Sequence, residues 1–361
     1  MWREKFLFIL TLLFIGGNLL WGALLKSLSP LFQSLSLLFC LIAVTLLLVV
    51  ILLRNGERLP LFIPLFFLLG GVNIGLATLL GEYTFLQDLS TSGPISELRS
   101  AFSSRLARII PPSATAENSL LEALTMGEKG DIPFELKRSY RLSGAMHLLA
   151  LSGLHVGFIY GILRSTLGFI PFKIRGAMII AFLLFYAIFS GASPSICRAV
   201  LMASIYEAGS FLGREKHGLN SLSLSALIIC CTDPQAPSTI SFQLSYSAML
   251  GIFLVHPAME RVIRRITFSR TVRKIWGATT LSISCQIFTA PLTLLYFGNF
   301  PLVSLLTNIL TMPAISAVMT LIPAAVALAD IPILGDWTSA LLHISIQILN
   351  LLVEILSTIL E

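Results

Sequence analysis

Residues 147–163 read "HLLALSGLHVGFIYGIL", an apolar run that also carries two histidines, a serine and three glycines. The run is long enough to cross the hydrocarbon core of a bilayer, which takes roughly 17–25 residues of α-helix. Polar side chains inside lipid need a partner or a wet cavity, whereas leucine needs neither. The stretch therefore predicts a membrane helix whose histidines and serine have a structural or functional reason to be there.

The composition of the chain supports this membrane interpretation. Of its 361 residues, 56% are hydrophobic and 12% are charged, whereas a soluble domain has about 25% charged residues. Candidate spans lie at 6–25, 31–53, 59–80, 146–164, 176–193, 196–212, 219–232, 240–258, 277–297, 302–329 and 337–357. We therefore expect an all-α fold, a polytopic integral membrane bundle of about 10–11 spans. The serine-rich stretch 219–232 and the proline-containing stretch 302–329 are candidates for broken or re-entrant segments.

Lysine and arginine give the chain a net charge of +6, and their positions predict its orientation. Cytoplasmic loops of membrane proteins are enriched in these two residues. One basic loop carries Arg261, Arg264, Arg265, Arg270, Arg273 and Lys274, and smaller basic loops lie at 54–58, 164–175 and 214–217. When these loops are placed in the cytoplasm, the N-terminus is cytoplasmic too and residues 81–145 lie outside.

Three regions are expected along the chain. Residues 1–80 hold three spans, residues 81–118 form an external linker and an amphipathic helix, and residues 119–361 form the transmembrane core. The amphipathic helix is predicted from apolar residues at helical spacing, namely Ile95, Leu98, Phe102, Leu106, Ile109 and Ile110. Two placements fit this pattern: the helix lies on the bilayer surface, or it packs over the external mouth of the spans.

Small and helix-breaking residues mark two places of close packing. Gly153, Gly157 and Gly161 repeat at four-residue intervals and form one stripe on a helix. Such a stripe lets a second helix approach until the backbones touch. Gly191 and Pro194 belong to "SGASPS", which separates two apolar runs. Glycine and proline together predict a helix break there, and a break at membrane depth needs protein or water around it.

Polar side chains of the same two stretches are candidates for a transport path. His155 lies about 200° around the helix from the first glycine of the stripe, and His147 and Ser152 stand at other angles. Ser193 belongs to the predicted helix break and Arg198 follows it. The arginine either binds an anion near the helix N-terminus or extends to the outer headgroups. The histidines either border a wet path or hold a neighbouring helix in register.

Catalytic motifs are not recognisable in the sequence, including the common nucleotide-binding and metalloprotease patterns. The five histidines and five cysteines lack the spacing of a metal site. We therefore expect no metal and no cofactor. A hydrolase using Ser152 and His155 has no identifiable orienting acid or oxyanion arrangement. The sequence favours a transport protein over an enzyme.

Three segments carry the most distinctive strings, at 124–157, 189–252 and 284–313. The first contains "HLLALSGLHVG", the second begins "FSGASPSICRA" and the third contains "TAPLTLLYFGNFPLVSLLTN". In these strings, their order and their spacing, the chain resembles the ComEC competence family. The resemblance covers residues 120–320 well and the N-terminal part loosely.

The resemblance implies a role in natural transformation, because this family imports one DNA strand through the bacterial inner membrane. Full-length members also have an external OB-fold-like domain and a C-terminal metallo-β-lactamase-like nuclease domain, and neither is recognisable here. The expected function is thus a channel component for single-stranded DNA, reduced and without its own nuclease. The basic loop at 259–275 would receive the emerging strand.

The resemblance also implies partners. These are single-stranded DNA, the lipid bilayer, a separate nuclease, an external DNA-binding protein and a cytoplasmic DNA motor. One bundle of this size leaves little room for a DNA path, which favours a homodimer. The alternative function is a carrier or channel for another solute, built on the same helical core.

Overall fold

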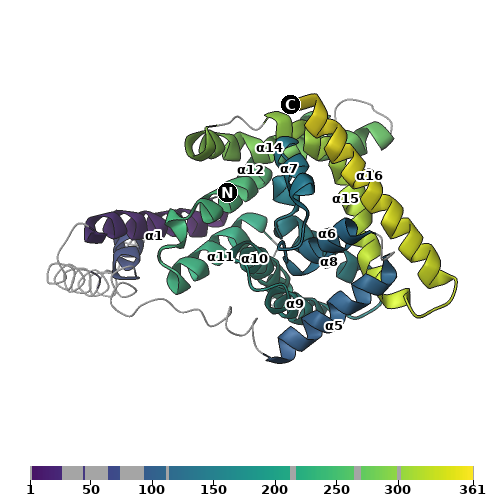
Figure 1. Cartoon of the computed structure of the whole chain (residues 1–361). Coiled ribbons are helices and arrows are strands. Elements are labelled where there is room, and N and C mark those ends of the chain that lie inside the picture. Colours follow the sequence, from purple (N-terminus) through teal and green to yellow (C-terminus); the bar gives the residue numbers. More distant parts are fainter. Residues whose placement is uncertain are drawn as a thin grey trace. The chain divides into compact units, whose positions relative to one another are not determined.

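The regular structure of the described residues is helical throughout, which confirms the predicted all-α fold (Figure 1). The computed structural model describes residues 2–26, 44, 64–73, 93–110, 114–211, 217–263, 270–298 and 302–360. Five helices in these residues are long and apolar enough to cross a membrane, with windows at Leu7–Leu24, Phe172–Phe189, Thr279–Phe297, Leu306–Leu328 and Leu334–Ile359. The chain is therefore a multi-pass membrane protein. Almost all of the predicted span 31–53 and both ends of 59–80 lie outside the described residues.

The helices form two compact units. The first unit contains Met1–Thr84 and Leu201–Tyr246, and the second contains Phe85–Val200 and Ser247–Glu361. Two helices contribute residues to both units, α10 (Pro194–Phe211) and α12 (Ile240–Leu254).

In the first unit, α1 (Trp2–Lys26) packs along α11 (Gly218–Thr232). Phe14 is buried in an apolar cluster with residues of α11. The Thr11 hydroxyl donates to the Ser223 carbonyl oxygen over 3.3 Å. Contrary to the expectation of a broken segment, α11 is one continuous helix, although it has only 15 residues.

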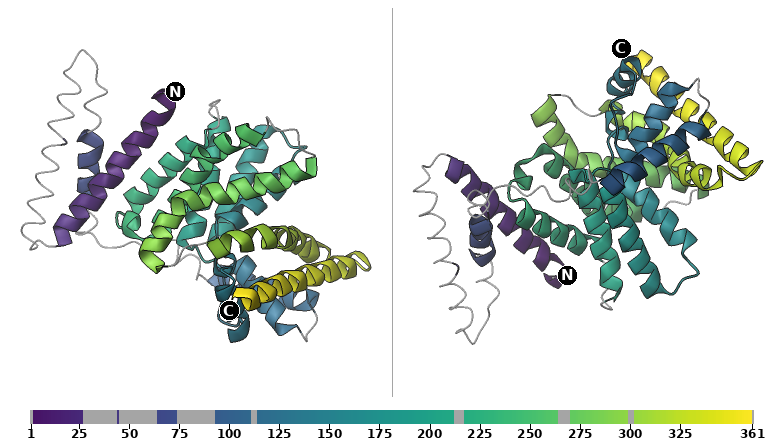
Figure 2. Two further views of the ribbon diagram at one scale, coloured as in Figure 1. Left: turned by 90° about the horizontal axis from the view of Figure 1, so that it is seen from above. Right: turned by 60° about the horizontal axis from the view of Figure 1, so that its bottom comes forward.

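In the second unit, α15 (Leu302–Leu328) and α16 (Leu334–Leu360) lie side by side (Figure 2). Both bury apolar side chains along their length, including Ile315, Val318, Ile322, Leu342, Ile346 and Leu349. Pro313 and Pro323 lie inside α15, yet the helix is continuous, so this stretch is not broken at either proline. Each proline removes one backbone donor, and packing against α16 keeps α15 helical across both positions.

The predicted amphipathic helix is α5 (Gly93–Ile109), and it packs against other helices of the second unit. Leu106 is completely buried, and the Phe102 ring meets the Phe189 ring edge-on with centroids 5.4 Å apart. The Arg105 Nε–H donates to the Val326 carbonyl oxygen over 3.0 Å. α5 therefore packs on neighbouring helices, and its placement relative to the bilayer stays a prediction.

Two predicted spans are interrupted. The stretch 146–164 begins as a short 3-10 helix, η1 (Met146–Leu148), bends, and continues as α8 (Gly153–Thr166). The reason is local, because Ser152 has extended backbone angles and caps α8 instead of extending it. The stretch 240–258 ends at Leu254, and a separate helix α13 (His256–Ile263) follows.

Of the other helices of the second unit, two lie in the polar stretch 81–145 and two overlap predicted spans. They are α6 (Thr115–Met126), α7 (Phe134–Leu142), α9 (Phe172–Phe189) and α14 (Arg270–Phe297). The last of these begins inside the predicted basic loop and continues past Pro291.

Candidate functional site

The start of α8 holds a buried histidine in a capping box. The Ser152 Oγ accepts a hydrogen bond from the Leu154 N–H over 3.3 Å, and the Ser152 N–H donates to the His155 Nδ1 over 3.2 Å. His155 is 1% exposed. Because its Nδ1 accepts a backbone proton, the neutral ring carries its own proton on Nε2. This Nε2 is buried and has no hydrogen-bond partner among the described residues, so the site contains a donor with no acceptor.

The start of α10 follows a sharp reversal after α9. Gly191 and Ala192 have φ angles of 87° and 50°, a left-handed conformation that suits glycine and strains alanine. Pro194 then occupies the first helical position, where its missing N–H removes no helix bond. The break predicted from "SGASPS" is confirmed. The Ser193 Oγ just before the helix is buried and without a hydrogen-bond partner in the part of the chain that the structure describes.

These two helix starts belong to neighbouring helices. A Cβ on Gly153 would lie 3.6 Å from the Cβ of Ala199 on α10, which is ordinary van der Waals contact. The residue before Ala199 is Arg198, which is only 6% exposed. Helix N-termini carry partial positive charge and unsatisfied N–H groups. Near their N-termini, α10 thus carries a buried guanidinium and α8 a buried imidazole donor, both groups that suit an anion.

His147 belongs to a different contact. Its Nδ1 lies 3.0 Å from the Gly144 carbonyl oxygen and its Nε2 lies 2.8 Å from the Asn308 Oδ1 on α15. The Thr307 hydroxyl donates to the Ser143 carbonyl oxygen beside it. These contacts hold the segment before η1 against α15, in agreement with the register role that was one of the two alternatives for the histidines. A place for His147 in a transport path stays a prediction.

The glycine stripe is only partly packed. Gly153 faces α10, whereas a Cβ on Gly157 or Gly161 would have no described atom within 4 Å. The interface predicted for the whole stripe therefore has no partner beyond Ala199 among the described residues.

The basic loop is only partly covered by the structure. Arg261 is exposed and its Nε–H donates to the Pro257 carbonyl oxygen over 3.2 Å. Arg264 and Arg265 lie outside the described residues. Arg270, Arg273 and Lys274 belong to the first turns of α14, and their side chains are not among those described.

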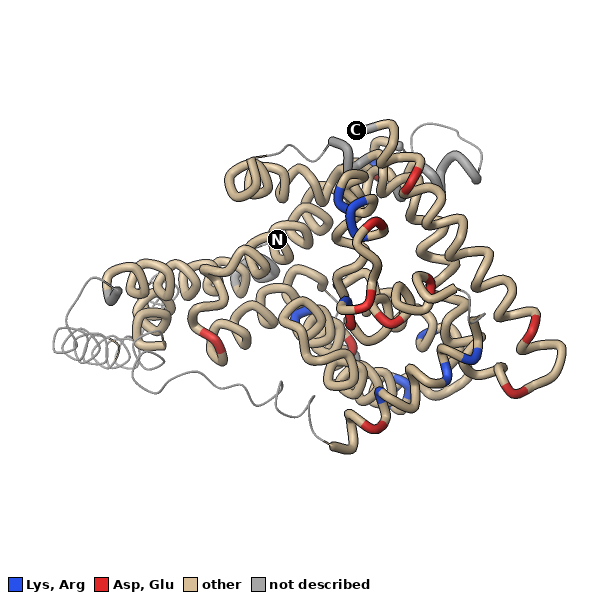
Figure 3. The backbone as a smooth tube through the Cα atoms, in the orientation of Figure 1, with Lys and Arg blue, Asp and Glu red and all other residues tan. Residues whose placement is uncertain are grey.

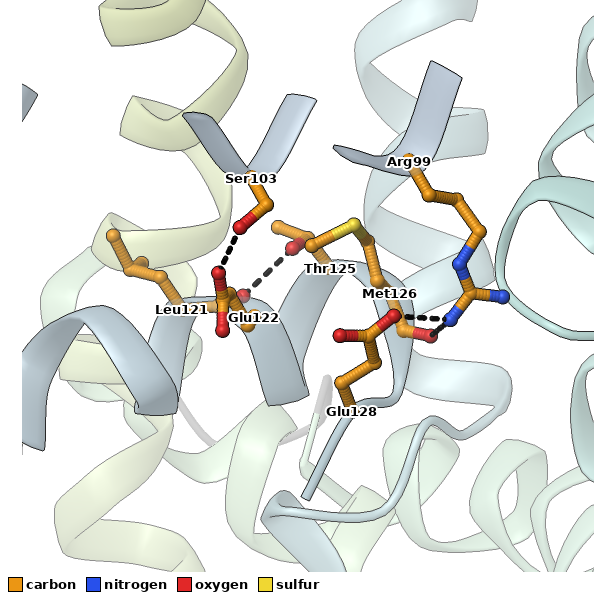
Figure 4. Close-up of polar contacts among 7 residues, drawn as sticks. All are labelled: Arg99, Ser103, Leu121, Glu122, Thr125, Met126 and Glu128. Atoms are coloured by element: carbon orange, nitrogen blue, oxygen red, sulfur yellow. Dashed lines mark hydrogen bonds and ion pairs between the residues drawn. The ribbon is translucent and has the colours of Figure 1, made fainter. Parts of the chain in front are cut away.

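Polar contacts around α5 and α6 were not predicted from the sequence. In Figure 4 the Arg99 guanidinium reaches Glu128 over 2.8 Å and the Met126 carbonyl oxygen over 3.4 Å, and the Ser103 hydroxyl donates to the Glu122 carboxylate. These pairs are 19 to 29 residues apart, beyond the reach of any helical periodicity. They fix α5 on the end of α6.

Polar contacts also attach this region to α16. The Glu117 carboxylate meets the His343 Nδ1, and the Tyr140 hydroxyl donates to the Asn350 Oδ1 over 3.1 Å. Burial raises the pKa of the Tyr140 phenol, so the hydroxyl keeps its proton and remains a donor. Such contacts between distant segments carry no local sequence signal.

The Tyr140–Asn350 bond gives a stability prediction. Tyr140→Phe removes the hydroxyl and leaves the Asn350 Oδ1 without this donor, so the free energy of unfolding should fall by about 0.5–1.5 kcal/mol. Thermal melting of the purified protein in detergent measures the change. Tyr140→Phe combined with Asn350→Leu removes both partners and should recover part of the loss. An unchanged melting temperature for Tyr140→Phe would mean that the bond does not stabilise α7 on α16.

Comparisons with known proteins place the region around this site in a family. The family model described as "Competence protein" matches residues 124–360, which run from the last residues of α6 through α16. Over 225 residues the chain is 28% identical to the ComE operon protein 3 of Bacillus subtilis (strain 168), covering 61% of this chain and 27% of that protein. Over 211 residues it is 27% identical to the competence protein ComA of Neisseria gonorrhoeae, covering 56% and 29%.

A third relative agrees with these two. The chain is 26% identical over 209 residues to the recombination protein 2 of Haemophilus influenzae, covering 55% of this chain and 26% of the relative. The alignments thus span between 26% and 29% of the length of these three relatives. No solved structure matches the chain. The family match covers most of the sequence and includes both helix starts of the site, and the chain therefore belongs to the competence protein family.

Proposed function

We propose that this chain is a channel component for the uptake of single-stranded DNA in natural transformation. The observation that carries the proposal is the burial of two polar side chains near the starts of neighbouring helices, Arg198 on α10 (6% exposed) and His155 on α8 (1% exposed). A polyanion that crosses lipid needs a path with fixed cations and hydrogen-bond donors. The site offers both, and it lies within the part of the chain that matches the competence protein family.

The proposed path extends from this site along α8 and α10. Its residues are Ser152, His155, Ser193 and Arg198, with His147 near the entrance to α8. The chain would be oriented with its N-terminus in the cytoplasm of a bacterial inner membrane, and the basic residues of 259–275 would meet the emerging strand there. Strand degradation, external DNA capture and the driving force would come from a separate nuclease, an external DNA-binding protein and a DNA motor.

Transformation of a deletion strain tests this function. Cells lacking the gene are expected to bind fluorescent double-stranded DNA at their surface but not to transfer it into the cytoplasm, and the full chain supplied in trans should restore transfer. A nuclease-protection assay measures the internalised DNA. Normal transformation of the deletion strain would refute the proposal and favour a carrier for another solute, for which the helix break at "SGASPS" would suit a midplane site.

A further inference from the structure

The short helix α7 presents one cationic face that also carries an aromatic ring. We define the α7 stripe as Phe134, Lys137, Arg138 and Arg141. At about 100° per residue, these side chains fall within roughly 100° of the helix circumference. Phe134 is 75% exposed, and both arginines are exposed. Figure 3 shows basic residues gathered on α7.

A second face of α7, beside the stripe, is anchored. Tyr140 points about 120° away from Phe134 around the helix, is fully buried and donates to Asn350 on α16. Because this face is fixed, the α7 stripe is held outward. Phe134 therefore remains exposed, although removing a Phe side chain from water would stabilise the protein by about 1.5–3 kcal/mol.

The chemistry of the α7 stripe suits single-stranded nucleic acid. Proteins bind single strands by stacking bases on exposed aromatic rings while lysine and arginine contact the backbone phosphates. A membrane surface fits less well, because a helix that lies in the bilayer interface separates an apolar face from its charged face. Here the ring and the cations share one face. Glu135, which is exposed, lies about 100° around from the ring and outside the stripe.

We infer that the α7 stripe is a contact surface for single-stranded DNA, with a base stacked on Phe134 and the cationic side chains on the phosphates. This inference rests on the proposed DNA-uptake function and adds a partner-binding surface outside the buried site. The two sites have different tasks: the α7 stripe holds the strand at the surface of the protein, and the α8–α10 site meets it inside.

Binding of a fluorescent oligo(dT) to the full chain in zwitterionic nanodiscs tests the surface. Phe134→Ala should weaken binding by between about fivefold and 150-fold without changing its salt dependence. Lys137→Gln combined with Arg141→Gln should lower the slope of log K against log salt by about 1.4, as expected for two lost phosphate contacts. The matched control, Lys173→Gln combined with Arg175→Gln, removes the same charge from the start of α9 and should leave affinity and slope near those of the wild type.

Several outcomes would overturn the inference. One is wild-type affinity in both α7 variants, and another is an equal loss in the α9 control. A third is selective loss of binding to anionic vesicles while oligonucleotide binding persists, which would make the stripe a lipid-contact surface. Melting temperatures near the wild-type value exclude misfolding, since the changed side chains lie on the surface. If the wild-type protein does not bind the oligonucleotide, the inference also fails, and the transformation assay then decides the proposed function separately.

Discussion

Replacing Gly251 with leucine should destabilise the protein and lower its amount in the membrane. Gly251 lies on α12, where a Cβ would overlap the Ser284 carbonyl oxygen of α14. Ser284 is fully buried, and its hydroxyl already donates to the Thr280 carbonyl oxygen over 2.7 Å. Backbone atoms cannot turn aside as a side chain can, so the two helices must separate. Overpacking of this kind costs about 1–3 kcal/mol or more, a large share of a typical total stability of about 5–15 kcal/mol.

The measurements are the amount of protein in isolated membranes and its melting temperature in detergent. Gly251→Ala should lower the melting temperature, and Gly251→Leu should lower it further. Gly157→Ala is the matched control, because it changes a helical glycine whose Cβ would lie in open space. It should be neutral or stabilise the protein by up to about 1 kcal/mol. If Gly157→Ala destabilises as much as Gly251→Ala, the predicted glycine stripe packs against residues that the structure does not describe.

These two glycines show what a sequence pattern can and cannot predict. Gly153, Gly157 and Gly161 form an obvious repeat, yet only the first has a close neighbour among the described residues. Gly251 stands in no repeat of glycines and still lies against a backbone. Two helix backbones can approach closely when only one of the helices has a small residue at the contact. Which helix lies there is decided by contacts between residues far apart in the sequence.

The membrane class and the helical fold could be predicted because they depend on composition and on local periodicity. The break before Pro194 could be predicted too, because Gly191 and Pro194 act on their own backbone. The interruption before α8 was missed, since the apolar run hides it. A local signal was present, however: Ser152 and His155 have the spacing of a capping box, with histidine at the position usually occupied by Glu or Gln.

The residues of the candidate site could be predicted from the sequence, but the arrangement of their helices could not. Ser152, His155, Ser193 and Arg198 were selected because polar residues are rare in apolar runs. That their helices are neighbours is shown by the α8–α10 contact at Ala199, which no local pattern indicates. The attachment of His147 to Asn308, 161 residues away, is likewise a property of the folded chain.

Arg198→Ala is expected to abolish most DNA uptake while leaving protein in the membrane. A hydrogen bond to a charged group contributes about 1.5–3 kcal/mol, so the loss of one phosphate contact should reduce transfer by roughly 10- to 150-fold. Because the site is buried and water competes poorly there, the reduction should lie toward the upper end. Arg198→Lys keeps the charge but loses the planar fork of donors, so transfer should be intermediate.

The control separates transport from folding. Arg164→Ala removes an exposed arginine near the end of α8, where it bonds the Tyr160 hydroxyl over 2.7 Å, and should leave uptake near the wild-type level. Membrane levels and melting temperatures are compared for every variant. A stable Arg198→Ala protein with normal uptake would remove Arg198 from the path. An unstable one is resolved by Arg198→Lys, because a purely structural role predicts that uptake follows protein level, whereas a phosphate contact predicts that uptake per molecule falls.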